Sequence, residues 1–407
     1  MIKNQKNIMR DLAHICVVPS TKVTCGSLVQ KEISNIVQGD TVISQTGKEQ
    51  VVKKVVTREV DEDVYKLNIQ SENENLNIIG NQNVCAIRAK DISCKFKLKN
   101  KRPQKCTYLL HKICSTIKNS LNQNCIIKEL KIQDIKVSDL KENDYLIYPV
   151  YKKNNIVPID ININRARLLG YYTAEGCINI NKKKSVFCVQ FTLNIDEKET
   201  LAKEISELVK TEFGSTVGFY NYHSRPNTLV LKFQNKKAID FFVKYCPGKA
   251  PQKMFRNNIL NLPDELQKNI VACYILGDGH FNIRDNIIRE ISVSSASCNL
   301  LCQIKNMIHQ WGWGTAKIRE GKTKINNKIF TGYSLSFSDS TAQILLGFFK
   351  HIKYLIRNKT TKNSCIVMNG FVLKRINKID VIRYNGKIYG LETDNGYITD
   401  GIIINNR

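Results

Sequence analysis

The feature that most constrains this sequence is an internal repeat in its second part, about residues 151–365. Leu168–Gly176 (LLGYYTAEG) is matched 103 residues further on (271 − 168 = 103) by Val271–Gly279 (VACYILGDG). After each copy the sequence predicts a strand, an amphipathic helix, a pair of strands with a Gly-containing turn, and a short apolar helix. Two copies of one helix–strand–strand–helix–strand–strand–helix unit predict two similar halves.

The expected elements follow the same order in both halves. In the first half they are a strand over 185–193, a helix over 198–212, paired strands within 218–233 and a helix over 238–245. In the second half they are a strand over 287–294, a helix over 299–311, paired strands within 315–337 and a helix over 342–354.

The rest of the chain has the alternating pattern of β-strands. Val-rich and apolar runs separated by Gly-Asp, Thr-Gly and Gly-Asn turn signals predict strands over 48–59, 64–69, 76–88 and 145–149. The same pattern returns near the end, over Val381–Arg383, Ile388–Thr393 and Tyr397–Asn405. A β module interrupted by the repeated module is the simplest organisation.

We therefore expect an α+β protein with four parts. Residues 1–15 are an N-terminal extension, and residues 16–150 with 376–407 form one split β domain that carries a basic insertion at 93–130. Residues 160–365 form the repeated domain, with halves at 160–260 and 261–365.

The charge balance predicts an anionic partner. Lys and Arg number 62 and Asp and Glu 36, which gives a formal net charge of +26. The positive charges of such a surplus repel one another in a compact fold. Binding to phosphates neutralises them and is favoured by counterion release, so nucleic acid is the first candidate partner. The alternative is a compositional bias of a Lys-, Asn- and Ile-rich chain. The insertion holds the densest cations, which are candidate DNA contacts or simply a solvated loop: Lys95, Lys97, Lys99, Lys101, Arg102 and Lys105.

Membrane and secretory classes do not fit the sequence. No apolar run approaches the 18 or more residues of a membrane span, and the first 15 residues lack an apolar signal region. With 14 cysteines and no export signal, we expect free thiols in a reducing, intracellular compartment, whether nucleus, organelle or cytoplasm.

The repeated motif places one acid near the end of each predicted helix, Glu175 and Asp278. Small residues four apart share one helix face in each copy, which permits close packing of the two helices: Gly170 with Ala174, and Cys273 with Gly277. Packing would bring the two carboxylates together, and hard oxygen ligands suit Mg²⁺ beside a phosphodiester. The plainer interpretation is two surface acids at helix ends.

These two motifs resemble those of LAGLIDADG homing endonucleases in the two-motif, monomeric form, over about residues 160–365. The resemblance implies a pseudo-symmetric αββαββα saddle whose β-faces lie in the DNA major groove. It implies a monomer that cuts both strands of a long double-stranded site, with two or more Mg²⁺ ions held by Glu175 and Asp278. Glu175 stands where Asp is commoner, and Cys273 replaces the first Gly of the second motif.

The family also uses basic residues beside the metal ions to stabilise developing charge. The resemblance assigns this role to Lys249, with Lys253 as the nearby alternative, and to Lys359 in the second half. Tyr222 and Arg225, on a predicted hairpin of the first half, are further candidates for DNA contact.

The β module resembles an intein, a Hint-fold self-splicing domain. Cys16–Val23, Gln38–Val42 and Leu140–Pro149 carry the N-terminal likeness, and 389–406 the C-terminal one. Splicing needs Cys16, which is present, and an internal Thr/His pair, a penultimate His and a final Asn. Here Ile79 and Gln82 replace the internal pair and Asn405 the penultimate His, while Asn406 is kept. Without an acid or base at these positions we expect defective splicing.

Three classes of function therefore remain open. The first is a site-specific DNA endonuclease with a vestigial Hint domain. The second is a non-cleaving DNA-binding or maturase-like RNA-binding protein on the same fold, and the third an active protein-splicing element. Both acids favour the first class over the second, and the missing splicing residues disfavour the third.

Overall fold

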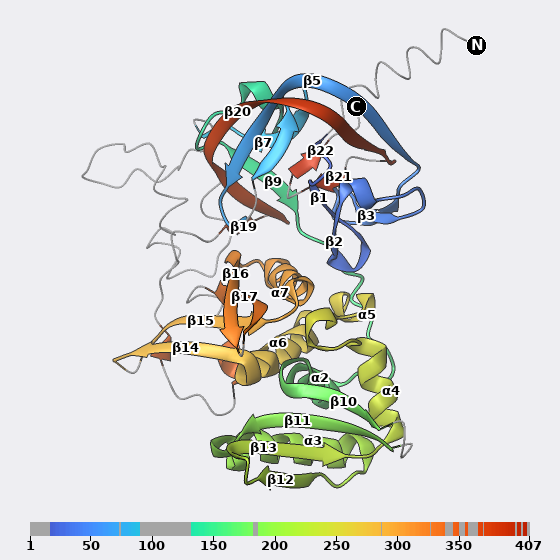
Figure 1. Cartoon of the computed structure of the whole chain (residues 1–407), viewed down its shortest axis with the longest axis vertical. Coiled ribbons are helices and arrows are strands. Elements are labelled where there is room, and N and C mark those ends of the chain that lie inside the picture. The colour runs from blue at the N-terminus through green and yellow to red at the C-terminus, as the bar shows by residue number, and fades with distance from the viewer. Residues whose placement is uncertain are drawn as a thin grey trace. The chain divides into compact units, whose positions relative to one another are not determined.

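The chain forms two compact units (Figure 1). The computed structural model describes residues 17–72, 75–89, 132–181, 186–285, 287–325, 327–337, 345–349, 355–356, 365–368, 370–394, 397–399 and 402–404. The first unit comprises Met1–Lys152, Ile308–Lys317 and Asn358–Arg407, and the second Lys153–Met307 and Ile318–Arg357. In the part of the chain that is described, no helix has the length and apolar character needed to cross a membrane.

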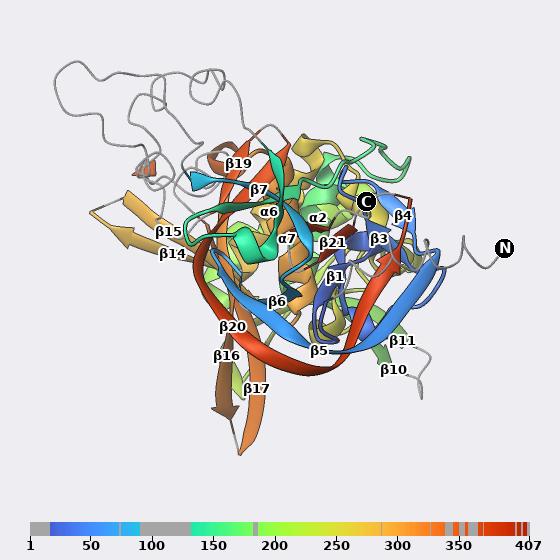
Figure 2. The same ribbon diagram turned by 90° about the horizontal axis from the view of Figure 1, so that it is seen from above.

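The first unit is built around two very long antiparallel strands, β5 (Lys54–Ile69) and β20 (Phe371–Glu392). Figure 2 shows them side by side as a curved ribbon. They belong to a sheet with the order β2-β1-β21-β22-β7-β9-β20-β5-β6, to which β8 and β19 add at β7 and β20. The other strands are β1 (Lys22–Thr24), β2 (Gln30–Glu32), β6 (Leu76–Ile79), β7 (Asn83–Ile87), β8 (Gln133–Lys136), β9 (Tyr145–Pro149), β19 (Ile366–Met368), β21 (Tyr397–Thr399), β22 (Ile402–Ile404) and the separate pair β3 (Thr41–Ile43) and β4 (Glu49–Val51).

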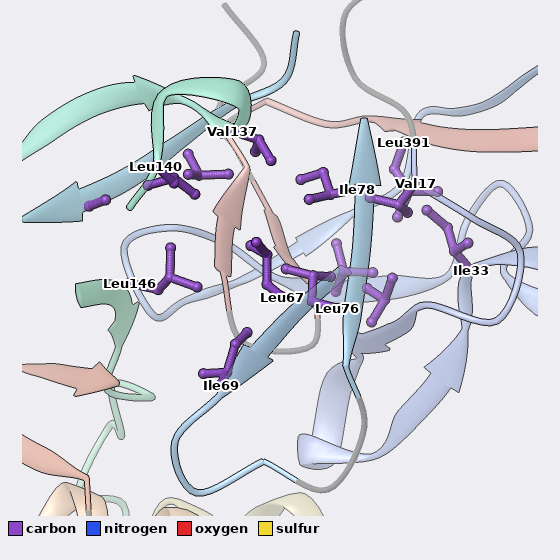
Figure 3. Packing of buried hydrophobic residues seen from close by; sticks show 14 of the residues in the cluster. Val17, Ile33, Leu67, Ile69, Leu76, Ile78, Val137, Leu140, Leu146 and Leu391 are labelled. Atoms are coloured by element: carbon purple, nitrogen blue, oxygen red, sulfur yellow. The ribbon is translucent and has the colours of Figure 1, made fainter. Parts of the chain in front are cut away.

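Apolar side chains from both ends of the chain make one core in this unit (Figure 3). Val17, Leu67, Leu76 and Ile78 are fully buried, and Leu391 is buried beside them. Val17 also exchanges two backbone hydrogen bonds with Tyr389, at 2.9 and 2.8 Å. The residues before the repeated module and those after it therefore fold together.

Several predicted strand boundaries in this unit are wrong. The strands expected separately over 48–59 and 64–69 merge in β5, which runs unbroken from Lys54 to Ile69 because it pairs with β20 throughout. Val381–Arg383 and Ile388–Thr393 are likewise parts of the one strand β20, which pairs with β5 on both sides of Gly386.

The single strand expected over 397–405 is the antiparallel pair β21 and β22. The strand expected over 76–88 is divided instead. Gly80 lies between β6 and β7, and a Cβ there would stand 2.6 Å from the Tyr65 ring.

The second unit contains two similar halves, apart from Ile308–Lys317, the end of one helix and the start of the next strand, which belong to the first unit. The first half consists of α2 (Ile163–Glu175), β10 (Gly176–Asn181), β11 (Val186–Asn194), α3 (Lys203–Phe213), β12 (Gly218–Tyr222), β13 (Arg225–Phe233) and α4 (Lys236–Tyr245). After α5 (Asn257–Leu260), the second consists of α6 (Asp264–Asp278), β14 (Gly279–Arg284), β15 (Ile287–Ser295), α7 (Cys298–Gln310), β16 (Thr315–Ile325) and β17 (Lys328–Phe337). The helix predicted over 342–354 lies mostly outside the described residues, which here hold the 3₁₀ turn Leu346–Phe348 and β18 (Leu355–Ile356).

The two halves repeat each other in strand order and in register. Their sheets run β10-β11-β13-β12 and β14-β15-β17-β16. Gly176, the residue after the first acid, pairs with Phe191, and Gly279, the residue after the second, pairs with Val293. The sequence repeat is thus a repeat of the backbone.

Helices α2 and α6 pack against each other through the small residues of the repeated motif. A Cβ on Gly170 would lie 2.3 Å from the carbonyl oxygen of Ile270 and 2.7 Å from the Cβ of Cys273. A Cβ on Gly277 would lie 2.6 Å from the Cβ of Ala174. The two backbones are therefore too close for any side chain at these two glycines.

We expect Gly170→Ala to destabilise the protein by about 1–3 kcal/mol, because the added methyl group must push α6 away. Chemical denaturation of the purified chain measures this as a lower unfolding midpoint. Gly321→Ala is the matched control, since no atom lies within 4 Å of the Cβ it adds. Equal midpoints for the two variants would contradict close helix packing at Gly170.

Candidate functional site

The two acids of the repeated motif are the last residues of their helices, Glu175 in α2 and Asp278 in α6. Each is followed by a glycine with extended backbone that begins a strand. A Cβ would stand 2.3 Å from the Tyr172 ring at Gly176 and 2.1 Å from the Ile275 carbonyl oxygen at Gly279. Glycine is therefore required for the chain to leave each helix sharply, and both carboxyls are held at a helix end.

The packing of α2 on α6 brings these two helix ends together. A Cβ on Gly277, the residue before Asp278, would lie 3.2 Å from Cγ and 3.8 Å from Oε1 of Glu175. Both acids are half-buried and keep some access to solvent. The structure thus gathers the predicted residues Gly170, Ala174, Cys273, Gly277, Glu175 and Asp278 along one helix interface.

Burial disfavours the charged forms of both carboxyls, and for Glu175 the charge of Asp278 adds to it. Burial, with the neighbouring charge of Asp278 next and that of Glu197 after it, raises the pKa of Glu175 to about 8. Burial raises the pKa of Asp278 to about 7, opposed by the positive charge of Lys253. Two acids that resist ionisation near neutral pH are typical of functional sites.

Lys253 is the cation beside the two acids. Its side chain is 6% exposed and runs under the end of α2, with its Nζ 4.9 Å from the centre of the Tyr172 ring. Nζ donates hydrogen bonds to the carbonyl oxygens of Tyr172, Thr173 and Gly176, at 2.8, 3.0 and 2.6 Å. All three ammonium protons are therefore engaged, and they hold the lysine against the C-terminal end of α2.

The sequence pointed first to Lys249, with Lys253 as the alternative. The structure places Lys249 on the exposed part of the same loop, while Lys253 acts on the pKa values of both Glu175 and Asp278. Lys359, predicted for the second half, lies outside the described residues.

Glu197 is a third acid near this site that was not identified from the sequence. It ends the 3₁₀ turn Ile195–Glu197 after β11, where its carboxylate accepts a hydrogen bond from the Asn194 backbone N–H at 2.8 Å. The sequence does carry a sign of this structural role, because Asn194 and Glu197 have the spacing of a capping box, which marks the start of a helix.

The donor set fits a magnesium ion that also binds phosphate. Among the residues that the structure describes, no group of three or more His, Cys, Asp or Glu side chains could enclose a metal ion. Glu175 and Asp278 supply two carboxylates, and Mg²⁺ is commonly held by one or two carboxylates with water and phosphate completing its shell. A divalent cation would also remove the repulsion that raises the pKa of Glu175.

The first sheet has a polar face that begins at Glu175. Residues of one face alternate through the registers β10–β11, β11–β13 and β12–β13. Lys232 lies 5.5 Å from the ring centres of both Tyr220 and Tyr222 and donates to the Tyr222 hydroxyl at 3.0 Å. The predicted residue Arg225 is exposed and pairs with Tyr222 at the hairpin. The face contains Cys177, Asn179, Cys188, Gln190, Thr192, Tyr220 and Lys232.

The residues read as splicing relics lie in the first unit or outside the described part. Ile79 is buried and its carbonyl accepts from the backbone N–H of Gln82 at 3.1 Å. Gln82 is 2% exposed and donates from Nε2 to the Asn83 carbonyl at 3.0 Å. Cys16, Asn405 and Asn406 lie outside the described residues, as do the insertion cations Lys95, Lys97, Lys99, Lys101, Arg102 and Lys105.

Comparison with known proteins finds likeness only among solved structures. No known sequence family matches the chain, and no curated protein matches it. The crystal structure of I-DmoI in complex with DNA and Mn is 13% identical, with a TM-score of 0.32, over 46% of this chain and 98% of that chain. The homing endonuclease I-WcaI bound to its DNA recognition sequence is 14% identical, with a TM-score of 0.31, over 47% and 84%.

The N-terminal LAGLIDADG domain of DUF199/WhiA is 12% identical, with a TM-score of 0.31, over 48% of this chain and 88% of that chain. Structural neighbours of about half the chain are thus LAGLIDADG homing endonucleases and a LAGLIDADG domain. At these identities and scores the likeness does not establish a function.

We expect Asp278→Asn to stabilise the metal-free protein progressively as pH rises. A carboxyl whose pKa is raised on folding binds its proton more tightly in the folded state, so its cost to stability grows from about pH 4 up to the folded pKa, about 7 for Asp278. Thermal unfolding in EDTA between pH 4.5 and 8.5 should show the variant gaining on the wild type by about 2–4 °C or more.

Asp240→Asn, at an exposed acid of α4, is the control and should show no such trend. With Mn²⁺ at pH 8, the wild type should gain melting temperature and Asp278→Asn should not. A difference between Asp278→Asn and wild type that is constant across this pH range would contradict the shifted carboxyl.

Proposed function

We propose that this protein is a metal-dependent, site-specific endonuclease that cuts both strands of double-stranded DNA, with Glu175 and Asp278 as its catalytic acids. The observation that carries the proposal is the pair of carboxyls at the ends of two closely packed helices that begin equivalent halves. Each acid is followed by a glycine and a strand of its own sheet, so each half offers one acid and one polar surface.

Double-stranded DNA is the partner that the charge and the surface support. The chain carries a net charge of +26, and the first sheet presents amide, hydroxyl, aromatic and cationic groups together. Asn, Gln, Thr and Lys side chains hydrogen-bond to base edges in the major groove, and a curved ribbon of strands can enter that groove. A pseudo-symmetric saddle of two such sheets would cover a long site as a monomer.

Glu175 and Asp278 would hold Mg²⁺, two or more ions in all, against the scissile phosphates. When bound, the metal polarises the phosphodiester and favours attack by water. The protein's own contribution is to fix two carboxyls at adjacent helix ends. Lys253 adds a fixed positive charge beside them, and since its three protons already bind carbonyl oxygens it acts as a charge rather than as a proton donor. Lys249 and Lys359 remain predictions for the same role.

For the first unit we propose a Hint-like module that no longer splices. Val17, the neighbour of Cys16, bridges Ile78 and Tyr389, and β22, which ends beside Asn405, pairs with β7 at Val84. The two junctions at which splicing would cleave the chain therefore adjoin strands of one sheet, beside the segment from Ile79 to Gln82. A buried Ile79 and an amide at Gln82 supply neither an acid nor a base there.

The endonuclease proposal is tested on a plasmid library that carries random DNA inserts. We expect the wild-type protein with Mg²⁺ to linearise a small subset of inserts, which sequencing of the cut ends identifies. On the recovered site, Asp278→Asn and Glu175→Gln should lose at least about 100-fold in cleavage rate and keep DNA binding. Asp240→Asn should cut normally.

Undiminished cutting by Asp278→Asn would remove this acid from the mechanism. Sequence-specific binding without any cutting by the wild type would favour the alternative, a non-cleaving DNA-binding or maturase-like RNA-binding protein.

We expect dithiothreitol to release no N-terminal fragment from the full chain. A thioester formed at Cys16 would be cleaved by the thiol, and residues 1–15 would be lost; without an acid or base at the matched positions this thioester should not accumulate. Intact mass before and after overnight incubation measures it, with Cys16→Ala as the control. Release from the wild type and not from Cys16→Ala would support an active splicing element instead.

A further inference from the structure

The lysine beside the two acids is delivered by the segment that joins the two halves, residues 246–263. The segment turns at Gly248, whose φ of +99° lies in the left-handed region that favours glycine. The backbone N–H of Gln252 then bonds the Lys249 carbonyl at 2.8 Å, and that of Arg256 bonds the Tyr245 carbonyl at 3.0 Å. Lys253 therefore lies on a loop that is closed by backbone hydrogen bonds on both sides of it.

One side chain from the second half holds this loop. Gln303 of α7 is fully buried, and its Oε1 accepts a hydrogen bond from the backbone N–H of Phe255 at 2.7 Å. Its Nε2 donates to the carbonyl oxygen of the same residue at 2.9 Å. Phe255 is itself fully buried and lies two residues after Lys253.

The chemistry of this contact requires an amide. A glutamine side chain carries one acceptor and two donors at its end, so it can bond both the N–H and the C=O of one residue. A glutamate would keep the acceptor and lose the donor, and a methionine of similar size would lose both. Either change leaves a backbone group of Phe255 buried and unpaired, which costs the desolvation of that group.

We propose that Gln303 is a positioning residue that holds Lys253 in place beside Glu175 and Asp278, so that α7 of the second half fixes a charge at the helix end of the first. This inference deepens the proposed endonuclease function and rests on it for its catalytic meaning. The structural part, that Gln303 keeps the ammonium of Lys253 on its three carbonyls, can be tested without DNA.

A matched control is a second buried glutamine that bonds the same joining segment. Gln267 of α6 is also fully buried, and its Nε2 donates to the carbonyl oxygen of Leu260 at 3.0 Å. It therefore anchors α5, seven residues beyond Lys253, rather than the loop that carries the lysine. Loss of Gln267 should disturb the fold to a similar degree while leaving Lys253 where it is.

The experiment measures the reactivity of single lysines in the full chain. Wild type, Gln303→Met, Gln303→Glu and Gln267→Met are treated briefly with acetic anhydride, and mass spectrometry gives the extent of labelling at each lysine. Lys249, exposed on the same loop, is the internal reference. Lys305, which is 8% exposed in α7, reports unfolding of the second unit, and Lys374, which is 3% exposed, reports unfolding of the first.

We expect Lys253 to be strongly protected in the wild type. In Gln303→Met its labelling relative to Lys249 should rise about tenfold, with a smaller rise in Gln303→Glu and none in Gln267→Met. Lys305 and Lys374 should stay protected in all four proteins. If the second unit of Gln303→Met does not fold, as labelling at Lys305 would reveal, Gln303→Glu carries the test.

The proposal is overturned if Lys253 stays as protected in the folded Gln303 variants as in the wild type. It is equally overturned if Gln267→Met exposes Lys253 to the same extent, because the effect would then be general loosening of the segment.

A second readout connects the lysine to the reaction. On the recovered DNA site, Gln303→Met should lower the single-turnover cleavage rate about tenfold and leave the affinity for DNA unchanged. If no site is ever cut, the endonuclease proposal fails, yet the labelling still decides whether Gln303 positions Lys253. If labelling responds and cleavage does not, the positional contact stands and its role in the reaction is lost.

Discussion

The close approach of α2 and α6 is the constraint from which the rest of the site follows. At Gly170 the carbonyl of Ile270 occupies the space that a side chain would need, and at Gly277 the methyl group of Ala174 does so. Because no side chain separates the two helices at these glycines, the acids at their ends lie close together in one partly buried site. In each half, the first strand of the sheet begins at the glycine directly after the acid, and that glycine pairs with the second strand.

That shared site sets an electrostatic balance. Two carboxyls in a partly dry site oppose each other, and burial raises the pKa of both. Lys253 lowers the pKa of each, but its protons are bound to carbonyl oxygens of α2 and its own pKa is lowered by burial. When both acids are ionised, one lysine does not neutralise them, and a divalent cation would supply the remaining positive charge.

The sequence allowed the repeat, the two acids and the small residues between the helices to be predicted, because each depends on local pattern. The lysine could not be assigned so firmly. Lys249 and Lys253 are four residues apart on one loop. Which of them is buried depends on the left-handed turn at Gly248 and on the hydrogen bond that Phe255 makes with the distant Gln303. The role of Gln303 could not be predicted, because its partner Phe255 is 48 residues away and is brought to it only by the folded structure.

The backbone repeats while the chemistry of the halves does not. Tyr171 and Tyr274 occupy equivalent positions, 103 residues apart (274 − 171 = 103). The hydroxyl of Tyr171 donates to the Glu204 carboxylate at 2.8 Å, whereas that of Tyr274 donates to the Ser294 backbone carbonyl at 2.8 Å.

Glu204 is buried against Arg167, so the first helix is held to α3 by an ion pair and the second helix by a neutral bond to β15. A buried ion pair adds little net stability but penalises any arrangement that separates its partners. The Arg167–Glu204 pair therefore holds α2 against α3, and Lys253 holds the C-terminal end of α2. Arg167 also donates from Nη1 to Oδ1 of Asn269 in α6 at 3.4 Å, so the arginine of this ion pair contacts the second helix as well.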